Sequence, residues 1–202
     1  MTDDTPTTSP GGASSRAGGL EDRLQRLEVA IEALSTRLGA VEASLELVQD
    51  IKRFRPLQQL LAAGDLEAAD RETARLLPEL LGRSAEAVKP DDLEQFPIPP
   101  LRIIDQLWSQ ASGGRFGFAT QARLYRDLGG SVESLSALDE ALFNRFRARV
   151  GWQGGRAFAL LEEPPALGQT TPEGHLPLRC WYTAYGLKAA NLLMARLIEG
   201  GL

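Results

Sequence analysis

The chain has 202 residues, 43% hydrophobic and 24% charged, enough to build one domain with a core of ordinary size and a hydrated surface. Its formal net charge of −5 argues against a nucleic-acid partner, because phosphate binding needs clustered Lys and Arg. A single cysteine, Cys180, and a single histidine, His175, exclude an internal disulfide and disfavour a closed transition-metal centre.

The first segment, residues 1–19, is rich in Thr, Ser, Pro and Gly and contains almost nothing to bury. Ordering such a segment costs conformational entropy that no apolar burial offsets, so we expect a disordered tail. The sequence has no apolar run of membrane-spanning length and its start lacks the features of a signal peptide. We therefore expect a cytoplasmic protein.

Residues 20–52 predict a coiled coil, because their apolar positions alternate in steps of four and three. Arg23 and Arg37 fall at g positions and Glu28 and Glu42 at the following e positions, which attract one another in a parallel homodimer. The pattern favours a homo-oligomer, and a long helix folded back on its own domain is the alternative. The apolar positions are Leu20, Leu24, Leu27, Ile31, Leu34, Leu38, Val41, Leu45 and Val48.

Residues 53–202 predict a helical domain. Its first two helices meet at Gly64, which suits the left-handed residue after a helix, and Asp65 suits the N-cap of the second. Residues 151–178 are rich in Gly and Pro and predict a long irregular loop, which is typical of functional or disordered segments. Further helices are expected over about residues 99–111, 116–128, 135–150 and 181–199.

Catalytic motifs are scarce in this sequence. His175 has no nucleophile-elbow motif beside it, and closeness of Cys180 in sequence does not make a catalytic pair. Residues 112–117, SGGRFG, match neither common nucleotide-binding glycine pattern. Aromatic residues with interspersed arginines remain, and they suit a flat apolar ligand that carries carboxylates. Core aromatics with solvated arginines are the alternative.

Four stretches carry a resemblance to a known family. They are FPIPPLRIIDQLWSQASGGRFGFATQARLY at residues 96–125, LLAAGDLEAADRETARLL at 60–77, RVGW at 149–152 and GHLP at 174–177. In this order and spacing they resemble the Genomes Uncoupled Four family of tetrapyrrole-binding proteins. The sequence departs from the usual family residues at Leu66, Pro100, Ile103, Ala111 and Ala119.

The resemblance implies an all-α, cupped-hand domain that binds protoporphyrin IX or magnesium protoporphyrin IX. It implies stimulation of magnesium chelatase in chlorophyll biosynthesis, without catalysis, metal site or required cofactor, and the large porphyrin-binding subunit of the chelatase as partner. It leaves room for peripheral association with photosynthetic membranes. A family-like oligomerising or sensory interaction module that has lost its ligand is the alternative. Carried over by position, the ligand-binding residues are Ser109, Phe116, Phe118, Trp152, Leu176, Arg179, Trp181 and Arg196.

Overall fold

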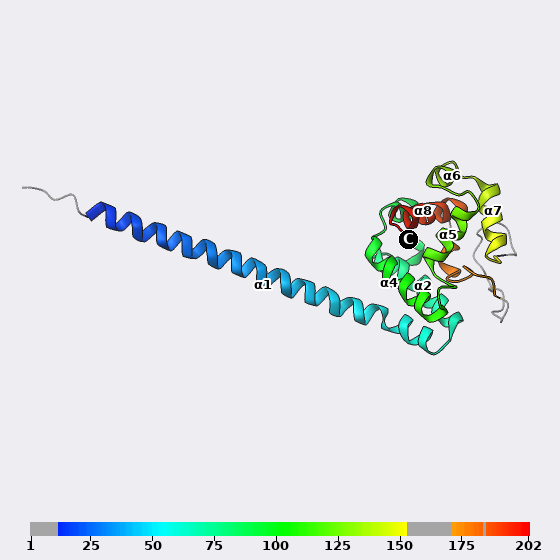
Figure 1. Cartoon of the computed structure of the whole chain (residues 1–202), viewed down its shortest axis with the longest axis horizontal. Coiled ribbons are helices and arrows are strands. Elements are labelled where there is room, and N and C mark those ends of the chain that lie inside the picture. Colours follow the sequence, from blue (N-terminus) through cyan, green and yellow to red (C-terminus); the bar gives the residue numbers. More distant parts are fainter. Residues whose placement is uncertain (1–11, 153–170, 184) are drawn as a thin grey trace, which may run out of the picture. The chain divides into compact units, whose positions relative to one another are not determined.

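The chain divides into two compact units, Met1–Lys52 and Arg53–Leu202. The first holds most of one long helix, and the second holds all other elements (Figure 1). The structure, a computed structural model, describes residues 12–152, 171–183 and 185–202, with side chains in the first helix described at residue 23, residues 25–39 and from residue 50 onward.

Every regular element in these described ranges is a helix, which confirms the all-α prediction. In chain order they are α1 (Gly12–Ala62), α2 (Leu66–Leu80), η1 (Ala85–Ala87), α3 (Pro90–Glu94), α4 (Ile98–Ser112), α5 (Phe118–Asp127), α6 (Val132–Ser136), α7 (Glu140–Arg149), η2 (Arg179–Trp181) and α8 (Gly186–Glu199), where η marks a 3₁₀ helix.

Helix α1 begins at Gly12, so the tail predicted up to residue 19 is helical in its second part. The first part of the tail, residues 1–11, lies outside the described residues. The helix continues through Pro56, whose missing N–H removes the usual hydrogen bond to the carbonyl of Lys52. No helix in the described ranges is both long and apolar enough to cross a membrane.

The turn between α1 and α2 has the predicted left-handed glycine and N-cap. Gly64 has a φ of +74°, in the left-handed region that favours glycine. Asp65 Oδ1 accepts the backbone N–H of Ala68 at 3.0 Å and so caps α2. Glu67 lies in the first turn, where its charge complements the helix dipole.

The helix predicted over residues 135–150 is two helices in the structure. Helix α6 ends at Ser136, and Asp139 Oδ1 accepts the Leu142 N–H at 2.9 Å to start α7. Between them Leu138 has a φ of +54°, the only positive φ of a non-glycine residue in the described ranges. The Asp139 cap therefore outcompetes continuation of the helix, at the cost of a strained leucine.

The last helix also begins later than predicted. Residues Arg179–Trp181 form η2, and α8 begins only at Gly186. Helix α8 then packs against α3, α4, α5 and α6, whereas η2 packs against α2 and α8. The C-terminal helix therefore organises the core, and η2 forms a separate wall beside α2.

Replacing Leu138 with glycine should stabilise the protein by about 1 kcal/mol, because glycine adopts a positive φ without steric cost. Urea unfolding followed by tryptophan fluorescence measures the change. The matched control is Ala137→Gly, where φ is −74° and added chain entropy should destabilise by about 0.5–1 kcal/mol. Equal effects of the two substitutions would contradict the assignment of strain to Leu138.

Candidate functional site: a cavity between α2 and η2

An apolar cavity of about 550 Å³ lies within the second unit, between α2, the residues that follow it, η2 and α8. Its volume falls within the roughly 300–1,000 Å³ typical of small-molecule sites. The charged residues in the lining are Arg71, Glu86 and Arg179. The other lining residues are mainly aliphatic or aromatic, namely Ala74, Leu77, Pro78, Leu81, Ala85, Val88, Leu93, Cys180, Trp181, Tyr182, Thr183, Tyr185, Ala189, Ala190 and Leu193.

The η2 wall of this cavity belongs to a segment that is buried although it is irregular. Residues 174–178 are all buried, and they have neither helical nor strand pairing of their own. Their backbone groups must therefore find hydrogen-bond partners elsewhere, because an unpaired buried group costs free energy.

The Gln121 side chain supplies several of these partners. Its Nε2 donates to the carbonyls of Gly174 at 2.9 Å and Pro177 at 2.8 Å. Its Oε1 accepts the indole N–H of Trp181 at 3.1 Å. One fully buried amide thus ties α5 to the irregular segment and to an aromatic side chain of the cavity wall.

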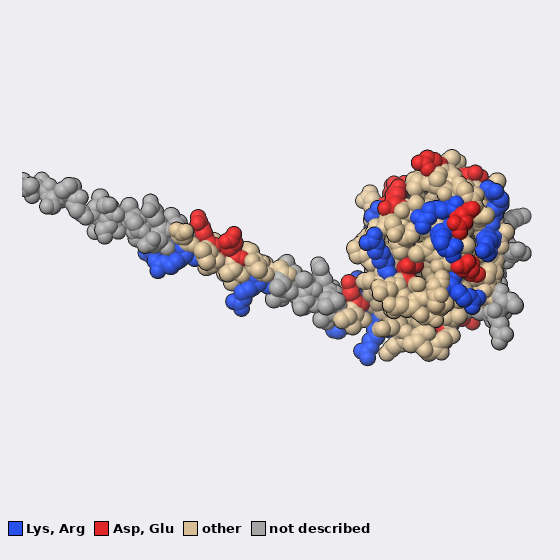
Figure 2. Space-filling view, in the orientation of Figure 1, with Lys and Arg blue, Asp and Glu red and all other residues tan. Residues whose placement is uncertain are grey.

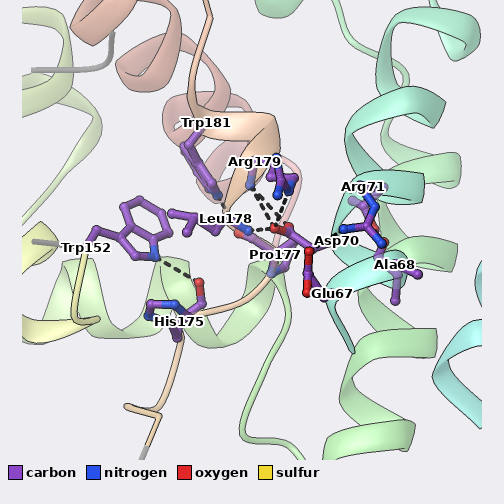
Figure 3. A network of polar contacts seen from close by, with 12 residues as sticks. Glu67, Ala68, Asp70, Arg71, Trp152, His175, Pro177, Leu178, Arg179 and Trp181 are labelled. Atoms are coloured by element: carbon purple, nitrogen blue, oxygen red, sulfur yellow. Dashed lines mark hydrogen bonds and ion pairs between the residues drawn. The ribbon is translucent and has the colours of Figure 1, made fainter. Parts of the chain in front are cut away.

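Asp70 ties the other end of the segment to α2 (Figure 3). Its Oδ1 accepts the backbone N–H groups of Leu178 at 2.7 Å and Arg179 at 3.1 Å. Arg179 Nε lies 3.7 Å from Asp70 Oδ2 and has no hydrogen-bond acceptor among the described residues. Burial raises the pKa of the Asp70 carboxyl to about 6, although both N–H bonds and the arginine oppose this rise.

His175 and Cys180 are not arranged as a catalytic cysteine–histidine pair. His175 Nδ1 lies 2.8 Å from the carbonyl of Val150, and burial lowers the pKa of its imidazole. Burial, with a smaller contribution from Asp70, raises the pKa of the Cys180 thiol well above its usual value. The thiol therefore stays protonated at neutral pH, and a protonated thiol is a poor nucleophile.

A chain of aromatic side chains supports the cavity wall from behind. Trp181 lies 5.6 Å from Trp152 and 6.4 Å from Phe118, measured between ring centroids. Trp152 continues to Phe146 at 5.3 Å, and its indole N–H donates to the His175 carbonyl at 2.8 Å (Figure 3). The contacts of Trp181 with Phe118 and of Trp152 with Phe146 are edge-to-face, and such contacts fix ring positions as well as burying area.

Two of the predicted ligand-binding residues, Arg179 and Trp181, line the cavity. Phe118 and Trp152 lie behind Trp181, buried in the core and absent from the lining. The structure thus brings these four residues together, with two facing the cavity and two packing behind it.

The other four predicted residues lie apart from the cavity lining. Phe116 is buried edge-on against Trp108 at 6.4 Å, and Leu176 is buried with its carbonyl accepting the Gly117 N–H. The half-buried Ser109 accepts a hydrogen bond from Gly114 through its carbonyl at 2.8 Å, which closes the end of α4. Arg196 Nε donates to the carbonyl of Phe96 at 2.8 Å.

Sequence reasoning did not single out Asp70 or Gln121. Asp70 follows Leu66 and Ala69 and precedes Thr73 and Leu77 on one apolar face of α2, so an acidic residue at that position signals a buried role. Gln121 ends the motif that carries the family resemblance, FGFATQ. The described residues contain no group of three or more His, Cys, Asp or Glu side chains that could hold a metal ion.

Comparisons with known proteins find one family and several distant relatives. The GUN4-like family model matches residues 48–194. The protein ycf53 of Porphyra purpurea is 32% identical over 128 residues, which cover 62% of this chain and 49% of the relative. The tetrapyrrole-binding protein, chloroplastic, of Arabidopsis thaliana is 29% identical over 146 residues, covering 62% of this chain and 48% of the relative. The chain therefore spans about half the length of the curated relatives it matches.

Solved structures give two further matches. GUN4 from Chlamydomonas reinhardtii has 21% sequence identity and a TM-score of 0.52, over 70% of this chain and 85% of that chain. The ligand-free structure of Arabidopsis thaliana GUN4 has 27% identity and a TM-score of 0.49, over 71% of this chain and 93% of that chain. The Chlamydomonas match shows that the helical fold is shared.

Asp70 should make stability depend on pH. Its pKa is about 6 in the folded protein and 3.8 when unperturbed, so the folded state holds the proton more tightly. The unfolding free energy of the wild type relative to Asp70→Asn should therefore fall by about 3 kcal/mol as pH rises from below 4 to above 6. Urea unfolding at a series of pH values measures this difference.

The control for this experiment is Asp65→Asn, because asparagine is an equally good N-cap at the exposed start of the same helix. This variant should keep the pH profile of the wild type through that window. Parallel profiles for the wild type and Asp70→Asn would show that burial does not raise the Asp70 pKa.

Replacing Phe118 should lower the stability of the folded protein. It is fully buried and packs edge-on against Trp181, so Phe118→Ala should lower the unfolding free energy by about 3–5 kcal/mol. Guanidinium unfolding measures the loss, and Phe118→Leu should lose clearly less because it leaves a smaller cavity. A loss below 1 kcal/mol for Phe118→Ala would be inconsistent with this core position.

Proposed function

The chain belongs to the GUN4-like family, the Genomes Uncoupled Four family that its motifs predicted. We propose that it binds a tetrapyrrole in the cavity between α2 and η2. The ligand is protoporphyrin IX or magnesium protoporphyrin IX. The observation that carries the proposal is an apolar cavity of about 550 Å³ whose lining includes both Trp181 and Arg179. A relative that shares 29% of its residues over 146 positions is named a tetrapyrrole-binding protein.

The lining suits the two chemistries of such a ligand. A tetrapyrrole has broad apolar faces, and burial of apolar area contributes about 25 cal/mol per Å². Trp181 and Tyr182 offer aromatic surface, and the lining alanines and leucines of α2 and α8 offer aliphatic surface. Arg71 and Arg179 offer guanidinium groups for propionates, since arginine holds carboxylates in a bidentate manner.

The donor atoms of the lining bear on the metal state of the ligand. Haem iron takes an axial protein ligand, namely histidine, methionine, a cysteine thiolate or tyrosine, and the described lining contains no histidine or methionine. Burial raises the pKa values of the Cys180 thiol and the Tyr182 phenol, which disfavours the deprotonated forms that would bind iron. Magnesium prefers oxygen ligands and retains water readily, and a metal-free porphyrin needs no axial ligand. The lining therefore favours protoporphyrin IX or its magnesium form over haem.

The proposed role is regulatory, without catalysis and without a required cofactor. The chain delivers or presents the tetrapyrrole to magnesium chelatase in chlorophyll biosynthesis and contacts the large porphyrin-binding subunit of that enzyme. It acts in the cytoplasm, peripherally at photosynthetic membranes, and self-associates through residues 20–52. The positions of His175 and Cys180 support a non-catalytic role. His175 is buried outside the cavity lining, where it cannot reach a bound ligand as a base, and the Cys180 thiol in the lining is protonated and a poor nucleophile.

Filling the cavity should weaken binding. Titration of protoporphyrin IX should quench tryptophan fluorescence in a saturable manner at micromolar ligand, because Trp181 lines the cavity. Ala74→Phe places a ring in the cavity from α2 and should weaken binding at least tenfold, about 1.4 kcal/mol.

The matched control is Ala68→Phe, on the same helix and also half-buried but outside the lining. It should bind as the wild type does. The same pair tests whether the regulatory role depends on binding, since only the binding-competent chains should raise the rate of a reconstituted magnesium chelatase. Absence of saturable quenching in the wild type would favour the interaction module that has lost its ligand.

A further inference from the structure

One face of α1 exposes a regular apolar stripe. Leu27, Ile31, Leu34 and Leu38 are 59–62% exposed and follow one another at steps of four, three and four residues. Val29 is exposed to the same degree, 62%, but lies outside this spacing. A stripe that repeats every 3.5 residues is the seam of a coiled coil, and it is buried only when another helix packs along it.

The charges beside the stripe differ between its two edges. With Leu27 and Leu34 at d positions and Ile31 and Leu38 at a positions, the basic residues Arg23, Arg26 and Arg37 fall at g and c. The acidic residues Glu28 and Glu32 fall at e and b, along the other edge. Figure 2 shows the same separation, with blue and red side chains on opposite edges of the described part of α1.

We propose that residues 20–52 pair in parallel and in register with the same residues of a second copy of this chain. In a parallel pair the g edge of each helix meets the e edge of the other, so basic meets acidic on both sides of the seam. Arg23 then faces Glu28 of the second copy, and Arg37 faces the e position at residue 42, which is also a glutamate.

An antiparallel pair would bring together edges of the same sign. In that arrangement e positions face e positions and g positions face g positions, which sets glutamate against glutamate or arginine against arginine. Charge complementarity therefore selects both the occupant of the stripe, a helix with the same pattern, and its direction. A second copy of this chain supplies that pattern without any further partner.

Parallel pairing has a functional consequence that extends the proposed function. The two copies of residue 53, where each helical unit begins, leave the coil at the same end. Two ligand-binding units are then tethered together, which raises the effective concentration of the second unit once the first has engaged a partner. The pairing itself does not depend on tetrapyrrole binding.

The mass of the full-length chain in solution tests the pairing. Light scattering after size exclusion should give the mass of two copies for the wild type. Ile31→Asp should give the mass of one copy, because it places a charge in the seam. Val29→Asp is the matched control, since Val29 has the same exposed fraction on the same helix, and it should keep two copies.

Disulfide trapping tests the direction, in a Cys180→Ala background that removes the native thiol. In a parallel, in-register pair, oxidation of Leu27→Cys or of Leu38→Cys alone should link two identical chains. When the two variants are co-expressed, no link should join residue 27 to residue 38, because those positions lie about 16 Å apart along the helix.

A wild-type mass other than that of two copies, or equal masses for Ile31→Asp and Val29→Asp, would overturn the pairing. Absence of a link between identical chains in either single variant, or a link between residues 27 and 38, would overturn the parallel, in-register arrangement. Protoporphyrin titration of Ile31→Asp keeps the two proposals separate, because this variant should quench as strongly per chain as the wild type. If Ile31→Asp has the mass of one copy and quenches like the wild type, the result supports the proposed coiled-coil pair. If neither the wild type nor Ile31→Asp shows quenching, the result contradicts only the proposed tetrapyrrole binding.

Discussion

A buried stretch of irregular backbone needs hydrogen-bond partners that it cannot supply itself. In the helical unit, side chains of the surrounding helices supply them. Residues 174–178 lie in the interior without helical or strand pairing. Gln121 and Asp70 supply the partners from α5 and α2. The cavity wall formed by η2 has its position because these two side chains hold the residues that precede it.

The two anchors differ in what they contribute. The Gln121 amide is neutral, donates twice and accepts once, so it stabilises the segment without a charge to desolvate. The Asp70 carboxylate is buried and carries a desolvation cost, which its N–H donors and Arg179 offset only in part. Placing a carboxylate there also holds Arg179 at the cavity, the feature that an anionic ligand would use.

The residues carried over from the family motif can be compared with the residues that line the cavity. Arg179 and Trp181 line the cavity, while Phe118 and Trp152 pack behind them, so four of the residues carried over meet in one region of the molecule. It did not separate lining residues from supporting residues, because Trp181 in the lining and Phe118 and Trp152 behind it are all aromatic and buried. Whether Ser109, Phe116, Leu176 and Arg196 contribute to binding stays a prediction, and their contacts lie elsewhere in the core.

Local sequence by itself determined the helical fold class and the Gly64–Asp65 turn, because periodicity and capping act over a few residues. The alternating steps of four and three between apolar residues likewise determined the exposed stripe of α1. Only the tertiary structure decided that α2, η2 and α8 enclose a cavity. Asp70 accepts hydrogen bonds from residues more than 100 positions away, and such a contact exists only once the core has formed.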